Sequence, residues 1–373
     1  MISLSKLPRW TISATTVVLA AGMAACAPSS PPGSPTAGGG TATDTATQST
    51  GGATLTINGA GATAPNPLYQ RWFAEYNKVD PAVQISYQSV GSGAGVKQFL
   101  EQTVDFGASD DPLKDADRSK YPQDRGGNPV QIPSTGLFLV FAYNLDGVDN
   151  LRLSREAYCG IVDGSIKTWN DPKLVQDNPG VTLPDAPISW AYRSDGSGTT
   201  AIFTNHLVEA CPNWKAGAGK SVEWSIGTGA KGNEGVTAQV QQTPGAIGYV
   251  EYSYAKENNL KMAALQNKAG EFITPSPEAA ANALEGVKPK ENFVVSVPDP
   301  DGKDAYPIVS LTYLLLYGEY QDPAKAEALK KVVNWALKDG KTAATDLGYL
   351  PLPDSLVSEI AAKLDSIQVA TAK

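Results

Sequence analysis

Residues Leu55 to Asn77 read LTINGAGATAPNPLYQRWFAEYN, a succession typical of a strand, a glycine-rich turn and a helix. Leu55–Asn58 is a short strand candidate, and Asn66–Asn77 carries apolar side chains at positions 68, 72, 73 and 76. That spacing places them on one face of a helix. A strand followed by a turn and a helix is the basic unit of an α/β fold.

The same alternation continues along the chain and predicts two α/β lobes. Further strands are expected at 83–87, 104–107, 137–143 and 245–250, an apolar run at 308–317, and helices at 96–102, 155–162, 199–210, 323–337 and 356–364. Such alternation favours parallel sheets. After the N-terminal leader roughly 320 residues remain, enough for two sizeable cores. Gln131–Ser134 and Ala305–Ile308 each contain a proline and are the predicted hinge segments.

Four short turns rich in glycine and serine indicate a site for a small anion. They are Gly59–Thr63, Gly91–Gly95, Gly107–Asp110 and Arg193–Thr199, and three of them run into an expected helix. A helix start offers unpaired backbone N–H groups and a partial positive charge. Small residues let an anion approach that backbone, and hydroxyls add donors. One such turn is commonly a plain helix cap, but four of them with an Asp and an Arg favour an oxyanion site.

Two nucleotide-binding motifs compete with this interpretation. Gly59-x-Gly61-x-x-Ala64 lies between a strand and a helix, as a dinucleotide fingerprint would, but the pattern is short. Gly217-Ala-Gly-Lys-Ser221 is similar to a P-loop, except that Trp214 occupies the position of its first glycine. The P-loop interpretation is therefore rejected.

The first 53 residues predict an exported, tethered protein. Residues 1–25 have a basic start and an apolar run too short to span a membrane comfortably, which indicates a signal peptide. Met23-Ala24-Ala25-Cys26 resembles a bacterial lipobox, which would make Cys26 the lipidated N-terminus; an ordinary secretion signal is the alternative. Residues 26–53 consist mostly of Ser, Thr, Pro, Gly and Ala, a composition typical of a flexible linker.

Charge and histidine content exclude several classes of function. The chain has a net charge of −8, with 30 basic and 38 acidic residues, which argues against nucleic-acid binding. A site built from neutral dipoles needs no basic surface, and surface charge is screened within about 8 Å at physiological ionic strength. His206 is the only histidine, so a transition-metal site or a His-based catalytic triad is not expected. We expect His206 to be a surface or packing residue.

Cys159 and Cys211 are the two cysteines that remain besides Cys26. In an exported protein two such cysteines favour a disulfide. The alternative is a pair of buried thiols that act as small apolar side chains.

Five blocks of sequence resemble the phosphate-binding proteins of bacterial Pst-type ABC importers. The blocks are Gly59–Pro65, Gly91–Lys97, Val104–Asp110, Arg193–Thr199 and Pro244–Tyr252, and the match continues in order to Leu350–Asp354. The resemblance implies a periplasmic-binding-protein fold, with phosphate in a cleft between two lobes. Together with the predicted hinge segments, the resemblance implies a first lobe at 54–133, a second lobe at 134–306 and a return to the first lobe at 307–373.

The resemblance also implies a set of ligand residues and no catalytic residues. By position these ligands are Thr63, Ala64, Ser92, Asp110, Arg193, Ser197, Gly198 and Thr199, with Asp195 as the partner of Arg193. The family often has an aromatic residue where this chain has Ala64. The expected contact at that position is through the backbone N–H, so the aromatic wall of the cleft would be missing.

Elementary chemistry assigns roles to the charged members of this set. Phosphate near neutral pH keeps at least one P–OH, whereas sulfate has none. A buried Asp110 carboxylate only accepts hydrogen bonds, so it would satisfy the P–OH and repel a bare oxyanion. Arg193 can donate a bidentate fork to two oxygens, while Asp195 holds that fork. The hydroxyls of Thr63, Ser92, Ser197 and Thr199 would complete the shell.

These observations predict a monomeric, extracytoplasmic phosphate-binding protein that is anchored to the membrane by lipid on Cys26. It would deliver phosphate to the permease of an ABC importer, and no enzymatic activity, cofactor, metal or nucleic acid is expected. The alternatives are a receptor for another oxyanion such as sulfate or molybdate, a secreted phosphohydrolase, and a structural or adhesive surface protein. A phosphohydrolase would need metal ligands or an activated nucleophile.

Overall fold

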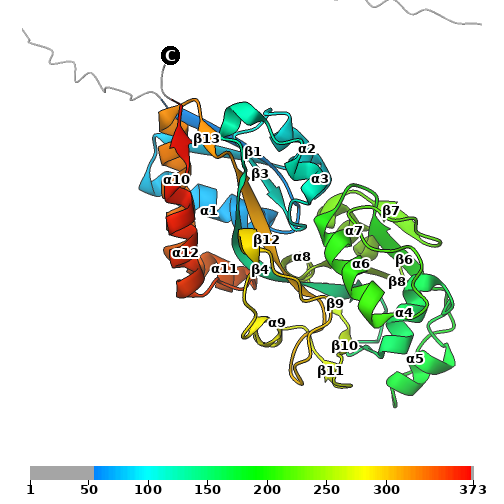
Figure 1. Cartoon of the computed structure of the whole chain (residues 1–373). Coiled ribbons are helices and arrows are strands. Elements are labelled where there is room, and N and C mark those ends of the chain that lie inside the picture. The colour runs from blue at the N-terminus through cyan, green and yellow to red at the C-terminus, as the bar shows by residue number, and fades with distance from the viewer. Residues whose placement is uncertain (1–53, 371–373) are drawn as a thin grey trace, which may run out of the picture. The chain divides into compact units, whose positions relative to one another are not determined.

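The computed structural model describes residues 54–370 (Figure 1). The predicted signal peptide, Cys26 and the linker lie outside the described residues. The twelve α-helices of the described part are α1 Asn66–Val79, α2 Ser92–Leu100, α3 Asp115–Arg118, α4 Arg155–Asp163, α5 Pro172–Asp177, α6 Gly198–Ala210, α7 Gly232–Gln242, α8 Tyr252–Glu257, α9 Pro277–Leu284, α10 Pro323–Lys338, α11 Lys341–Leu347 and α12 Asp354–Asp365. Between residues 54 and 370, no helix is both long and apolar enough to cross a membrane.

Most strands of the described part belong to one mixed sheet. The strands are β1 Leu55–Gly61, β2 Val83–Ser89, β3 Phe106–Ser109, β4 Val130–Tyr143, β5 Arg152–Leu153, β6 Ser189–Arg193, β7 Thr228–Ala230, β8 Ala246–Glu251, β9 Lys261–Met262, β10 Ala264–Gln266, β11 Phe272–Ile273, β12 Val309–Leu316, β13 Glu319–Tyr320 and β14 Gln368–Val369. The order in the large sheet is β2-β1-β3-β12-β4-β8-β6-β7, and β9 pairs with β4. Small sheets join β11, β10 and β5, and β13 with β14.

The fold is two α/β lobes that share the central strands β4 and β12. In the first lobe β1 pairs in parallel with β2 and β3, and in the second β6 pairs in parallel with β7 and β8. Each lobe thus contains a three-stranded parallel set with helices packed on it, as the alternating sequence pattern predicts. In Figure 1, β4 and β12 run from the elements coloured blue, cyan and red toward those coloured green.

The expectation of parallel sheets does not hold for the central strands. β12 is antiparallel to both β3 and β4, and β4 is antiparallel to β8. β12 carries the chain back from the second lobe, so it runs opposite to the strands that it joins. The direction of the strands in this part of the sheet therefore depends on the long-range path of the chain, which cannot be predicted from the local periodicity of apolar residues.

The predicted hinge segments lie at different points of this central ladder, since Gln131–Pro133 pair with residues 313–315 and Ile308 lies opposite Leu139. Residues 130–138 of β4 pair with β12, and residues 139–143 pair with β8, so one uninterrupted strand serves both lobes. Pro133 lies inside β4 opposite Tyr313, at a bulge that adds one residue to the ladder. Ala305–Ile308 leads directly into β12. The lobe boundaries at 133/134 and 306/307 themselves stay a prediction.

Glycines in β1 allow its close contact with β3. A Cβ on Gly61 would lie 2.7 Å from the backbone nitrogen of Ala108, and a Cβ on Gly59 would overlap the ring of Phe106. The tight packing of the two strands therefore accounts for the glycines of the dinucleotide-like motif. At the second nucleotide-like motif, no helix follows Ser221 as a P-loop would require.

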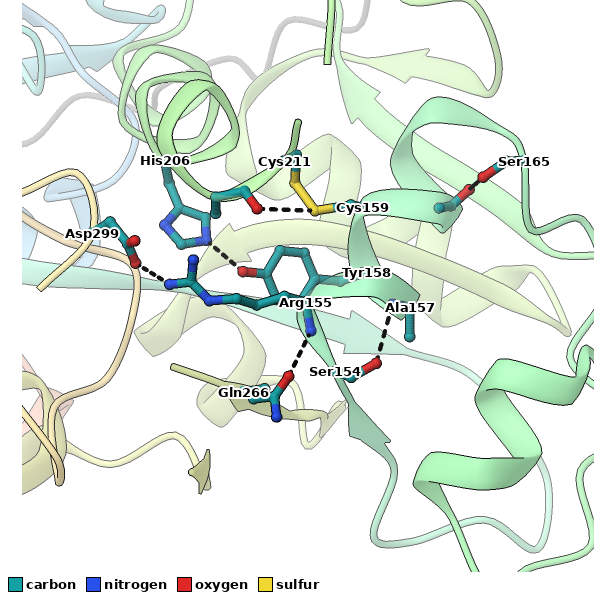
Figure 2. Close-up of a disulfide and its surroundings, with 12 residues drawn as sticks. Ser154, Arg155, Ala157, Tyr158, Cys159, Ser165, His206, Cys211, Gln266 and Asp299 are labelled. Atoms are coloured by element: carbon teal, nitrogen blue, oxygen red, sulfur yellow. Dashed lines mark hydrogen bonds and ion pairs between the residues drawn. A yellow bond between two sulfur atoms is a disulfide. The ribbon is translucent and has the colours of Figure 1, made fainter. Parts of the chain in front are cut away.

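The second lobe contains a disulfide next to the only histidine (Figure 2). Cys159 in α4 and Cys211 at the end of α6 are bonded, with their Cα atoms 5.5 Å apart. His206 is fully buried, with Nδ1 2.8 Å from the Pro298 carbonyl and Nε2 3.1 Å from the Tyr158 hydroxyl. A carbonyl only accepts, so Nδ1 donates to it and the Tyr158 hydroxyl donates to Nε2. Burial lowers the pKa of His206 to about 4, so the neutral ring is a packing residue.

Candidate functional site

The predicted ligand residues lie where strands end and helices begin. Thr63 and Ala64 follow β1, Ser92 begins α2, and Asp110 follows β3. Arg193 ends β6, and Ser197–Thr199 form the start of α6. Parallel strands that end at one edge of a sheet bring such residues together. The polar members are all at least 96% buried.

Close contacts join the residues of the two lobes. Within the first lobe, the Asp110 backbone N–H donates to Ser92 Oγ at 3.1 Å, which places both residues beside Gly198 of the second lobe. A Cβ on Gly198 would lie 2.7 Å from the Asp110 Cβ and would overlap Ser92 Oγ, so only glycine fits there. The Gly93 N–H donates to the Gly196 carbonyl at 2.7 Å, a second contact between the lobes. The structure therefore brings the turns of both lobes to one place.

Arg193 is held in the site by two hydrogen bonds to Asp195. Its Nε donates to Oδ1 at 2.8 Å and its Nη2 to Oδ2 at 2.6 Å, while Nη1 donates to Thr199 Oγ1 at 3.2 Å. Burial opposes ionisation of Asp195, but the hydrogen bonds and charge of Arg193 lower its pKa below the ordinary value. A guanidinium has five N–H groups, so two remain for a ligand. The predicted role of Asp195 as the partner that holds the fork fits this geometry.

Asp110 offers a buried acceptor. Its Oδ1 accepts from Thr312 Oγ1 at 2.8 Å, whereas Oδ2 has no hydrogen-bond partner among residues 54–370. Burial raises the pKa of Asp110 to about 6, although the Thr312 hydrogen bond and the charge of Arg193 oppose this shift. Above that pH the carboxylate can only accept, so Oδ2 suits a ligand atom that carries a hydrogen.

The helix starts add donors around Asp110 and Arg193. The Ser197 hydroxyl accepts from the Thr200 N–H at 3.0 Å and caps α6, which leaves its hydrogen free to donate. The backbone N–H groups of Gly198 and Thr199 are the first two of α6 and have no acceptor among residues 54–370. Such a cluster of donors, with one acceptor in Asp110, suits an oxyanion that still carries one proton.

Ala64 takes part through its backbone. Its carbonyl accepts from the Tyr349 hydroxyl at 2.6 Å, and the Thr63 carbonyl accepts from the Tyr254 hydroxyl at 2.7 Å. Two tyrosines from distant parts of the chain thus hold the turn through its carbonyl groups.

Several residues of the site were not predicted from the sequence. They are Asn233, Thr312, Tyr254 and Tyr349. Asn233 lies in a fifth glycine-rich turn, Gly229–Gly235, which spans the end of β7 and the start of α7 and resembles the other four. That pattern could have identified it. Thr312 stands in an apolar strand and the tyrosines in ordinary helical or loop sequence, so local sequence carried no signal for them.

Glu251 is a second buried carboxyl beside the site. Its backbone N–H donates to Asn233 Oδ1 at 2.9 Å, and its side chain accepts from the Ser253 N–H at 2.9 Å. Burial raises its pKa to about 8, despite the hydrogen bonds from Ser253. The group is therefore mostly neutral at pH 7 and does not repel an anion.

Comparison with known proteins agrees with this geometry. Residues 38–339 match the model of a PBP superfamily domain. The phosphate-binding protein PstS of Pasteurella multocida is 42% identical over 316 residues, which cover 83% of this chain and 89% of the relative. The chain belongs to the PstS family. A PstS of Methanocaldococcus jannaschii is 38% identical over 327 residues, covering 81% and 84% of the two chains.

A solved structure also shares the fold of this PstS family member. The high-affinity periplasmic phosphate-binding protein PfluDING, determined with bound phosphate, superimposes with a TM-score of 0.70 at 23% identity. The alignment covers 83% of this chain and 93% of that one. The two-lobe expectation from the sequence is confirmed by this likeness.

Proposed function

We propose that this protein binds inorganic phosphate outside the cytoplasm and delivers it to the permease of an ABC importer. The observation that carries the proposal is the buried Asp110 Oδ2 acceptor within a ring of donors that includes Arg193. The PstS names of the relatives support the same ligand. The relatives are binding proteins, and binding without chemical conversion of phosphate is the function proposed here.

The proposed ligand shell consists of the residues expected from the sequence. Hydrogen-bonding capacity assigns the contacts of two of them, Asp110 and Arg193. Asp110 would accept from the P–OH of phosphate, and the two free N–H groups of Arg193 would donate to its ionised oxygens. Hydroxyls and helix N–H groups would complete the shell, from Thr63, Ala64, Ser92, Ser197, Gly198 and Thr199. Equilibrium dialysis with labelled phosphate and with sulfate as competitor tests this function. Equal competition by sulfate would favour the general oxyanion receptor instead.

Replacement Asp110→Asn should weaken phosphate binding and reduce discrimination against sulfate. An amide can donate to an ionised oxygen, so the repulsion of a bare oxyanion disappears. The loss of the charge-assisted bond should cost about 1.5–3 kcal/mol of phosphate affinity. Calorimetric titration with each anion measures both effects.

Asp111→Asn is the matched control, because Asp111 is the adjacent acid and pairs with Lys114 and Lys220. This variant should keep the wild-type preference for phosphate. If Asp110→Asn retained that preference too, Asp110 would not be the selective group.

We also propose that Cys26 anchors the protein to the membrane as a lipidated N-terminus, with the monomeric binding domain on the linker. In fractionation of cells, wild type should pellet with membranes and Cys26→Ser should remain soluble. A single acyl chain binds membranes only reversibly, so durable retention requires more than one. Wild type recovered free in the medium would contradict the anchor and would leave the phosphate proposal intact.

A further inference from the structure

Asn233, at the start of α7, bridges the two lobes inside the site. The residue is fully buried, and its Nδ2 donates to Thr63 Oγ1 at 2.7 Å and to Thr199 Oγ1 at 3.1 Å. Its backbone N–H also donates to Thr63 Oγ1, at 3.1 Å. One amide side chain therefore contacts a hydroxyl from each lobe.

The orientation of this amide is determined by its surroundings. Asn233 Oδ1 accepts from the backbone N–H of Glu251 at 2.9 Å. An N–H can only donate, so the oxygen of the amide must face Glu251 and the nitrogen must face the threonines. Both hydrogens of Nδ2 are then used by the two hydroxyls.

Both threonine hydroxyls have their acceptor capacity filled. Thr63 Oγ1 accepts twice from Asn233, and Thr199 Oγ1 accepts from Asn233 and from Arg193 Nη1. A hydroxyl has two lone pairs and one hydrogen. When both lone pairs are occupied, the hydroxyl can take part in one further bond, and only as a donor.

We infer that Asn233 is a positioning residue that makes the hydroxyls of Thr63 and Thr199 obligate donors to the bound oxyanion. The inference rests on the proposed function, since it describes how the same site recognises phosphate. Asn233 itself need not touch the ligand.

The consequence is that the site sorts the oxygens of the ligand by their protonation. An oxygen next to Thr63 or Thr199 meets a donor and must be ionised or doubly bonded, because a P–OH hydrogen would find no acceptor on either hydroxyl. The protonated oxygen is left to Asp110, whose carboxylate is the acceptor. Asn233 and Asp110 thus select the same orientation of a monoprotonated oxyanion.

The test is a double-mutant cycle on phosphate binding measured by calorimetry. Asn233→Ala should raise the phosphate Kd about tenfold or more, because the hydroxyls become free to rotate away from the ligand. In a Thr199→Val background the same substitution should cost a smaller factor, since one of the hydroxyls that it orients is gone. Asn233→Ser, which is too short to reach both threonines, serves if the alanine variant fails to fold.

Asn267→Ala is the matched control. Asn267 is also buried, and its amide donates to backbone carbonyls at Gly302, Lys303 and Ala305. This control should lose stability and keep the wild-type Kd. If Asn233 had a purely structural role, the fold-changes in Kd caused by Asn233→Ala and Thr199→Val would multiply in the double mutant. Either that result or an unchanged Kd in Asn233→Ala would overturn the inference. Wild type that fails to bind phosphate would overturn the proposed function itself, so the two failures are distinct.

Discussion

Arg193→Ala should abolish most of the phosphate affinity. The Arg193 side chain is 1% exposed and forms a bidentate pair with Asp195, whose own side chain is 12% exposed. Removal of the cation leaves Asp195 and Asp110 as buried carboxyls without their positive neighbour, and removes the N–H groups proposed to hold the ligand. Truncation of one charged partner in a buried hydrogen-bonded contact costs about 2–5 kcal/mol of binding free energy, a factor of roughly 30 or more in Kd. Calorimetry with phosphate measures the loss.

Two further variants make the Arg193 experiment specific. Arg193→Lys should recover only part of the affinity, because an ammonium cannot make the bidentate pair and still point two N–H groups at the ligand. Arg155→Ala breaks an ion pair with Asp299 elsewhere in the second lobe and should leave the Kd unchanged. Full affinity in the lysine variant would show that Arg193 acts as a point charge.

Replacement of both Cys159 and Cys211 by serine should lower the free energy of unfolding by about 4 kcal/mol, by the loop-entropy estimate. The bond closes a loop with a sequence separation of 52 residues. Its two ends are α4 and the C-terminal end of α6 (Figure 2). The proposed ligand contacts lie at the other, N-terminal end of α6. We therefore expect a large change in urea unfolding with little change in the phosphate Kd.

Reduced wild type is the control for the serine variant, and the two should unfold at similar urea concentrations. Mass measurement after alkylation without reductant should find no free thiol at either cysteine of wild type. Two alkylated cysteines in folded wild type would contradict the bond, and an unchanged unfolding midpoint on reduction would contradict its contribution to stability.

The parts of the fold that local sequence determines were predicted correctly. The helix expected at 323–337 spans Pro323–Lys338, and the one at 199–210 spans Gly198–Ala210, because apolar spacing and capping residues define both. The helix expected at 96–102 begins earlier, at Ser92, since the small residues of its turn adopt helical geometry and place Ser92 at the helix start. β4 is longer than expected because its first half is paired with β12, which the sequence alone does not reveal.

The residues of the site are likewise of two kinds: some are marked by the local sequence, and others are brought there only by the long-range path of the chain. Each of the five glycine-rich turns can be recognised within a few residues, because close approach of neighbouring backbone or of a ligand to backbone N–H groups requires small side chains. Thr312 is 202 residues along the chain from its partner Asp110, and Tyr349 is 285 residues from its partner Ala64. Their contribution follows from the return of the chain through β12 and from the packing of the C-terminal segment, and no short motif marks either residue.

The shared strand β4 has a consequence for the entropy of ligand capture. Leu139 donates to the Ile308 carbonyl at 3.0 Å, so the two crossing segments remain hydrogen-bonded where the lobes meet. A paired ladder permits far fewer relative orientations than two flexible linkers would. The lobes are thus confined when the chain folds, and a small ion with few atoms need not supply the free energy to bring them together.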